Sequence, residues 1–171
     1  MAFGPWQILG LNKMSEVFKI IGKVDIDKIK AELKGKKVTA QFPLQTDETG
    51  ERSAVGSNYE LRDDEKDFCK PIYDDMPYTN SIIEKYGMYR TRVMKLLGGS
   101  CYTVHVDNDP RIHIPLVSDE KNYFICNDEL IKMPADGSVY LVDTRYPHTA
   151  VNASSKRFIR THILGNVNDF R

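Results

Sequence analysis

The sequence has few cysteines and no long apolar run. Only three of its 171 residues are cysteine, Cys69, Cys101 and Cys126, and their spacing matches no CxxC or other metal-ligand motif. Free thiols in a reducing compartment are the simplest account of this odd number. Nowhere do about 18 apolar residues follow one another, and the first residues lack a basic region before an apolar stretch. We therefore expect a cytoplasmic protein without a signal peptide and without a membrane span.

The chain also lacks an excess of charge of either sign. Its 24 basic residues balance its 24 acidic residues, so no overall field attracts nucleic acid or an anionic membrane. The hydrophobic content of 41% and the charged content of 28% are ordinary for a globular protein. A length of 171 residues fits one domain with a core of its own, so we expect a single domain over residues 1–171.

The two halves of the chain differ in texture. Residues 1–87 mix helix and loop signals, with helices expected at 25–33 and 79–86 and a strand-like stretch at 37–45. Residues 46–67 have few large apolar groups and are expected to form a long loop, either a lid or a surface insertion.

Residues 88–167 consist of short β-type stretches separated by turn signals, a spacing typical of a sandwich or barrel. The expected strands cover residues 88–97, 100–106, 111–117, 122–127, 130–133, 138–143, 148–152 and 157–167. We predict a mainly β (α+β) protein, an antiparallel jelly roll with an N-terminal helical layer.

Polar residues that can hold a metal ion occur in this β half. His105 and Asp107 are two apart in an expected strand, so their side chains leave the same face. His148, in a turn-like stretch several strands later, is the best candidate for a third ligand. Two imidazoles and one carboxylate occupy one face of an octahedron and leave three positions open, which suits non-haem Fe(II). Each of these residues taken singly is more often a surface or core residue; the joint pattern favours the metal site.

Basic residues accompany the candidate ligands. An Fe(II) enzyme of this type commonly uses 2-oxoglutarate and O₂, and the far carboxylate of 2-oxoglutarate needs a cation, for which arginine is best suited. Arg157 and Arg160 both fall in the last expected strand, three residues apart, so only one of them can point inward. Arg111 and His113 share a face of another strand and can donate hydrogen bonds to the 1-carboxylate of the co-substrate, or form an ordinary surface pair.

Three stretches, RVMKLLGGSCYTVHVDNDPRIHIPLV, MPADGSVYLVDTRYPHTAVNAS and RTHIL, resemble the aspartyl/asparaginyl β-hydroxylase family of Fe(II)/2-oxoglutarate dioxygenases, which includes relatives similar to free-proline hydroxylases. The resemblance covers roughly residues 88–165, and we find none in residues 1–87. It implies a double-stranded β-helix with His105, Asp107 and His148 as iron ligands. It also implies that Arg111 and His113 contact 2-oxoglutarate. The Arg-Thr-His context favours Arg160 as the arginine for the far carboxylate, with Arg157 as the alternative.

The leading hypothesis is therefore a dioxygenase that hydroxylates an aspartyl or asparaginyl residue of a peptide, or a free amino acid such as proline. Two alternatives stay open. One is a cupin-like jelly-roll metalloprotein that uses the same three ligands without 2-oxoglutarate and has no need of an inward arginine. The other is a non-enzymatic binding module, which would bind no stoichiometric Fe(II).

Overall fold

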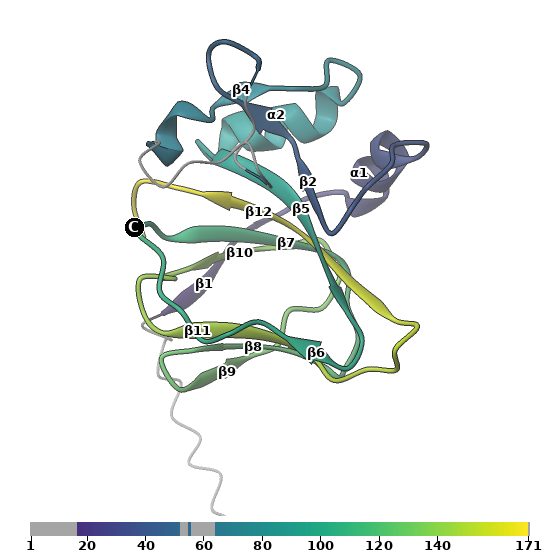
Figure 1. The fold of residues 1–171 in the computed structure, drawn as a ribbon, viewed down its shortest axis with the longest axis vertical. Helices are drawn as coiled ribbons and strands as arrows, with labels where there is room; N and C mark the ends of the chain where they lie inside the picture. The colour runs from purple at the N-terminus through teal and green to yellow at the C-terminus, as the bar shows by residue number, and fades with distance from the viewer. Residues whose placement is uncertain (1–16, 52–54, 56–63, 171) are drawn as a thin grey trace, which may run out of the picture.

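The computed structural model describes residues 17–51, 55 and 64–170, and this part of the chain is mainly β (Figure 1). The strands are β1 (Phe18–Lys23), β2 (Gln41–Pro43), β3 (Gln45–Thr46), β4 (Lys70–Pro71), β5 (Tyr89–Leu97), β6 (Ser100–Cys101), β7 (Arg111–Val117), β8 (Asn122–Cys126), β9 (Glu129–Ile131), β10 (Ser138–Val142), β11 (His148–Asn152) and β12 (Ile159–Asn166). The helices are α1 (Ile26–Leu33) and α2 (Pro77–Lys85), with a 3₁₀ turn η2 (Glu65–Asp67). None of these helices is long and apolar enough to cross a membrane.

Two antiparallel sheets form the body of the molecule. The larger has six strands in the order β1-β10-β7-β12-β5-β2, and the smaller has four in the order β6-β11-β8-β9. Figure 1 shows the smaller sheet beneath the larger one, with α1 and α2 on the opposite side of the larger sheet. β3 and β4 pair separately. The arrangement is compatible with the predicted jelly roll.

The six-stranded sheet is buried on both faces, and β7 shows why its sequence alternates between charged and apolar residues. Ile112 and Ile114 belong to the apolar cluster that also holds Ile29 of α1 and Ile82 of α2. The alternate residues of β7 point the other way, toward the four-stranded sheet, because successive side chains of a strand leave opposite faces. The polar side chains of RIHIPLV therefore lie inside the molecule.

Both expected helices are present, and local chemistry explains where each begins and ends. The Asp25 side chain accepts hydrogen bonds from the backbone N–H of Asp27 and Lys28, which caps α1. Gly35, just beyond α1, has a φ of +87°, a conformation that glycine adopts without a Cβ clash. α2 begins with Pro77, whose missing N–H would have had no helical partner at that position.

Several expected boundaries are wrong. The strand predicted over 100–106 ends at Cys101, and beyond it only His105 forms a β-bridge. The strand β1 was not predicted; it pairs with β10 at the edge of the larger sheet. Of the predicted loop at 46–67, residues 52–54 and 56–63 lie outside the described residues, and the rest includes η2. The cysteines are free thiols as expected: Cys69 and Cys101 are exposed and Cys126 is buried.

We predict that Ile114→Ala lowers the free energy of unfolding by about 2–5 kcal/mol, because it leaves a cavity in the apolar cluster under the helices. Ile114 is 0% exposed, whereas Val117 at the end of the same strand is 39% exposed. Val117→Ala is the matched control and should change stability by less than about 0.5 kcal/mol. Urea denaturation followed by circular dichroism measures both. Equal effects would show that this face of the sheet is not the core.

The cysteines should separate by reactivity. Burial raises the pKa of the Cys126 thiol to about 11, so this thiol stays protonated and unreactive at pH 8. A thiol-disulfide reagent should therefore modify Cys69 and Cys101 in the folded protein and Cys126 only after denaturation. Mass spectrometry of the labelled peptides identifies the sites, and rapid labelling of Cys126 under native conditions would contradict the packing described here.

Candidate metal centre

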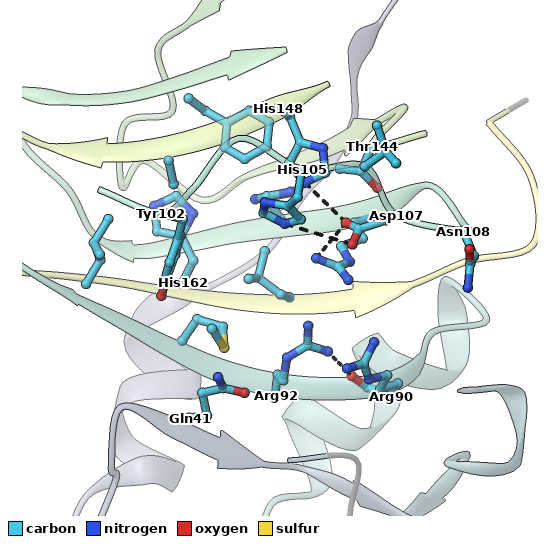
Figure 2. Close-up of a pocket in the computed structure, with 18 of the residues that line it drawn as sticks. Gln41, Arg90, Arg92, Tyr102, His105, Asp107, Asn108, Thr144, His148 and His162 are labelled. Atoms are coloured by element: carbon cyan, nitrogen blue, oxygen red, sulfur yellow. Dashed lines mark hydrogen bonds and ion pairs between the residues drawn. The ribbon is translucent and has the colours of Figure 1, made fainter. Parts of the chain in front are cut away.

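Backbone pairing brings together three side chains from distant parts of the chain. After β6 the chain runs beside β11, where the His105 N–H donates to the His148 carbonyl (3.1 Å) and the His148 N–H donates to the His105 carbonyl (2.9 Å). The Asp107 N–H donates to the Thr144 carbonyl (2.9 Å). Figure 2 shows the side chains of His105, Asp107 and His148 converging on one side of this pairing. We call these three residues the triad.

The nitrogen and oxygen atoms of the triad face one another. One ligand atom from each residue lies within 4.8 Å of the others, with His148 Nε2 3.2 Å from Asp107 Oδ2 and His105 Nε2 4.0 Å from Asp107 Oδ1. Each histidine uses its other nitrogen on the backbone: His105 Nδ1 lies 2.7 Å from the Thr103 carbonyl and His148 Nδ1 lies 2.9 Å from the Tyr146 carbonyl. Since a carbonyl only accepts, both Nδ1 atoms donate, and Nε2 is the atom that each ring turns toward Asp107 and could offer to a metal ion.

Asp107 is held in its ionised form. Burial by itself raises the pKa of a carboxyl group, but the contact with His148 and the charge of Arg111 outweigh it, so the pKa of Asp107 is lowered. Arg111 Nη1 lies 2.7 Å from Asp107 Oδ2, and Arg111 Nε donates to Asn166 Oδ1 (3.1 Å). The triad is therefore a preformed set of two imidazoles and one carboxylate, a donor set that fits a divalent transition metal.

The triad opens onto a cavity of about 450 Å³ between the two sheets. Arg160 lines this cavity from β12 and is 6% exposed. Among the described residues, Arg160 Nε has no hydrogen-bond partner, and the guanidinium makes one long contact of 3.4 Å, from Nη2 to His162 Nδ1. Burial lowers the pKa of Arg160 to about 10, so it is still a cation at neutral pH. A buried guanidinium with free donors is suited to an anion from outside the chain.

Arg157 lies elsewhere. The sequence placed it in the last strand, but it is exposed in the turn before β12 and does not line the cavity. The strand begins two residues later, at Ile159, so the two arginines do not share one strand as expected. Of the two arginines, the structure brings only Arg160 into the cavity with the triad.

Two further buried histidines, His113 and His162, line the same cavity. Burial, with the charge of Arg160 as the next cause, lowers the pKa of both His113 and His162 well below the usual value, so both rings are neutral at physiological pH. Within the part of the chain that the structure describes, neither ring nitrogen of His113 has a hydrogen-bond partner, and its ring packs edge-on against Phe124 (centroids 4.8 Å apart). His113, predicted to contact a co-substrate, thus lies in the cavity with its polar atoms free.

Sequence reasoning missed the arginines of β5. Arg90 and Arg92 line the cavity from this strand, and Arg90 pairs with Glu65 of η2. A signal was present, because YRTRVM alternates charged and other residues as RIHIPL does. From the sequence alone it is not known that the helices cover the other face of this sheet. The arginines of β5 therefore look like residues on a solvent-exposed strand face.

We predict that the protein binds one Co²⁺ per chain and that His148→Ala lowers the affinity by more than about 100-fold, since it removes a ligand rather than an outer hydrogen bond. His162→Ala is the matched control, because His162 is buried in the same cavity but outside the triad. Calorimetric titration and the visible spectrum of the cobalt form report the binding. Retained affinity in His148→Ala, or an equal loss in His162→Ala, would contradict the assignment of the site.

Comparison with known proteins bears on the chemistry of this site. A search of curated proteins found no match to the chain. The family model described as aspartyl/asparaginyl beta-hydroxylase matches residues 24–166, which includes all of the triad and extends well before residue 88, where the resemblance seen in the motifs begins. Membership of a hydroxylase family implies an enzyme, and the triad supplies a site suited to a metal ion. The chain belongs to the aspartyl/asparaginyl β-hydroxylase family.

Proposed function

We propose that the protein is an Fe(II)- and 2-oxoglutarate-dependent dioxygenase that hydroxylates an amino-acid residue of the aspartyl/asparaginyl type, or a free amino acid such as proline. Bound iron and 2-oxoglutarate would supply the oxidation: one atom of O₂ enters the substrate C–H bond as hydroxyl, the other enters succinate, and the decarboxylation that releases CO₂ provides two electrons. The chain's own residues bind, orient and shield the reactants.

One observation carries this proposal: the triad lines the same cavity as the buried guanidinium of Arg160, which has no acidic partner among the described residues. The triad offers two imidazole nitrogens and a carboxylate oxygen, the donor set of non-haem Fe(II) oxygenases with open positions. Arg160 offers a buried cation for a carboxylate that reaches away from the metal. Manganese or cobalt could occupy the same ligands, because ligand type alone does not select among these ions.

The other polar residues have roles in this scheme. We propose that His113 and His162, both neutral, orient the co-substrate between the triad and Arg160 as hydrogen-bond partners. Arg111 is ion-paired to Asp107, and in the proposed enzyme it would hold that carboxylate in a fixed position. We propose that it would also contact the 1-carboxylate of 2-oxoglutarate. Buried groups that need no reorganisation are the usual means by which a protein stabilises charge.

We propose further that the two facing sheets form a double-stranded β-helix, with the helices of residues 1–87 as a layer over its larger sheet. The substrate is a small molecule or a peptide rather than nucleic acid or a membrane, since the reactive residues lie inside a cavity. Glu65, at the end of the predicted loop over 46–67, lines that cavity, which supports a role for this loop near the substrate.

A jelly-roll metalloprotein that works without 2-oxoglutarate is the alternative. It would use the triad in the same way but would leave the buried charge of Arg160 without a purpose. A non-enzymatic binding module would in addition leave the triad without a function, although the Nε2 atoms of its two histidines face the carboxylate of Asp107. Both are separated from the dioxygenase by the experiment below.

We predict that anaerobic titration of the Fe(II)-loaded protein with 2-oxoglutarate produces a metal-to-ligand charge-transfer band in the visible spectrum. In Arg160→Met the half-saturating concentration of 2-oxoglutarate should rise by about 100-fold, because a charge-assisted contact worth roughly 2–3 kcal/mol is lost. Arg157→Met is the matched control, and its titration should equal that of the wild type since Arg157 is exposed.

The outcomes decide between the alternatives. No band in a folded, iron-loaded protein would reject the use of 2-oxoglutarate and favour the metalloprotein. A band that weakens in Arg157→Met but not in Arg160→Met would reject the assignment of the arginine.

A further inference from the structure

Arg92 is a second buried arginine of the cavity. In the register of the larger sheet it lies opposite Leu164 of β12, which in turn lies opposite His113 of β7, so these three residues form one row across the sheet. Arg160 is four residues from Leu164 along β12, roughly 13 Å away at about 3.3 Å per residue. Figure 2 shows Arg92 on the opposite side of the cavity from the triad, with Gln41 and Arg90 beside it.

The guanidinium of Arg92 lacks an acidic partner among the described residues. It is 5% exposed, its Nη1 donates to the Arg90 carbonyl (3.0 Å), and its Nε has no hydrogen-bond partner. The neighbouring arginines are neutralised: Arg90 pairs with Glu65 and Arg111 with Asp107. Burial, together with the charges of Arg111 and Arg90, lowers the pKa of Arg92 to about 9, which still leaves it charged at neutral pH. A buried cation without a partner is unfavourable unless a ligand supplies the opposite charge.

The charge balance of the cavity also indicates a site for a second anion. Four of the described residues that line it are arginines, and two are carboxylates. His113 and His162 are neutral, so they do not change this balance. The two negative charges of 2-oxoglutarate balance only the two positive charges of a divalent metal ion. The two cations in excess, Arg92 and Arg160, therefore remain when metal is bound, and one free carboxylate of the co-substrate can meet only one of them.

We propose that Arg92 forms a second anion-binding subsite, which holds a carboxylate of the substrate across the cavity from the triad. This inference rests on the proposed function in one respect: it takes the ligand of Arg160 to be the co-substrate. The evidence for the subsite itself is the position of Arg92 in the cavity and its lack of an acidic partner among the described residues. The substrate class is thereby narrowed to molecules with an ionised carboxylate close to the carbon that reacts. Neutral amides of the same shape are disfavoured, because they leave the cation of Arg92 unpaired.

A carboxylate fits the donors that Arg92 has left. Because Nη1 is occupied by the Arg90 carbonyl, the remaining edge of the guanidinium consists of Nε and Nη2. The two parallel N–H groups of such an edge match the two oxygens of one carboxylate. The side-chain carboxylate of an aspartyl residue and the α-carboxylate of a free amino acid share this chemistry.

The first test needs neither iron nor 2-oxoglutarate. Thermal unfolding of the metal-free protein is followed in acetate and in acetamide at equal ionic strength, for the wild type, Arg92→Met, Arg160→Met and the double variant. We expect acetate, but not acetamide, to raise the melting temperature of the wild type, each single variant to lose part of the shift, and the double variant to lose all of it. A shift that is unchanged in Arg92→Met, or equal shifts with acetamide, would overturn the proposal.

Folding of the variants is checked in the same experiment. Without ligand, Arg92→Met should melt at least as high as the wild type, because it removes a buried charge that has no acidic partner. Arg92→Lys keeps the charge and should retain a reduced acetate shift. An Arg92→Met protein that melts well below the wild type, together with an Arg160→Met protein that by itself loses the whole acetate shift, would show that Arg92 has a structural role only.

The second test separates Arg92 from the co-substrate. In the anaerobic 2-oxoglutarate titration, Arg92→Met should keep the half-saturating concentration within about threefold of the wild type, whereas Arg160→Met raises it by about 100-fold. The reverse result would make Arg92 the co-substrate residue and overturn the assignment. Absence of the band in the wild type would reject the proposed function while the acetate result still decides the subsite.

A third test asks whether Arg92 binds a side-chain carboxylate or the α-carboxylate of a free amino acid. Probe molecules of each kind are added to the protein loaded with Co²⁺ and 2-oxoglutarate, and the melting temperature is measured. N-acetyl-L-aspartate N′-methylamide presents a side-chain carboxylate, and L-proline presents a free α-carboxylate. Their counterparts, N-acetyl-L-asparagine N′-methylamide and L-prolinamide, carry a neutral amide in place of that carboxylate. The probe whose shift in melting temperature disappears in Arg92→Met identifies the source. Shifts from the neutral counterparts as large as those from the acids would contradict the subsite.

Discussion

The central strands of the six-stranded sheet are buried on both faces, and the rest of the structure depends on this constraint. Its outer face packs Ile112, Ile114 and Ile163 against the isoleucines of α1 and α2, which form the larger apolar cluster of the protein. A sheet with one exposed face must obtain its hydrophobic stabilisation from the inner face. In this protein burial of the outer face supplies that stabilisation. The inner face can therefore carry arginines and histidines. In a half-exposed sheet these polar side chains would face water. Here they face one another and the triad inside the molecule.

The inner face accepts its charges in two ways. Arg111 and Arg90 are neutralised within the chain by Asp107 and Glu65, and Asn166 joins the two pairs by accepting from Arg111 and donating to Glu65. This network links a triad carboxylate to the 3₁₀ turn η2. Arg92 and Arg160 are not neutralised among the described residues, so their burial lowers stability in the absence of a ligand. Such local loss of stability is common where a protein prepares a binding site for a charged molecule.

The triad owes its geometry to backbone pairing rather than to a regular strand. His105 lies in a stretch with a single bridge, and that bridge is made with His148 itself. The two imidazoles are thus positioned by reciprocal hydrogen bonds between their own peptide groups, and carbonyls two residues before each one fix the ring tautomer. The prediction from strand alternation that the side chains of His105 and Asp107 come together agrees with the structure, although the regular strand on which it was based is absent.

Local pattern was enough to indicate a mainly β protein, the two helices and the shared face of His105 and Asp107, because alternation and capping residues are properties of neighbouring residues. It made His148 only a candidate for the third ligand, because the pairing that brings His148 to His105 joins distant segments. It did not indicate the strand β1, which exists because β10 offers an edge to pair with. Nor could it choose between Arg157 and Arg160 on physical grounds, or assign Arg92 to the cavity. Those assignments depend on which face of a strand another layer covers. Burial of a charged side chain is decided by contacts between segments far apart in the sequence, and only the tertiary structure contains them.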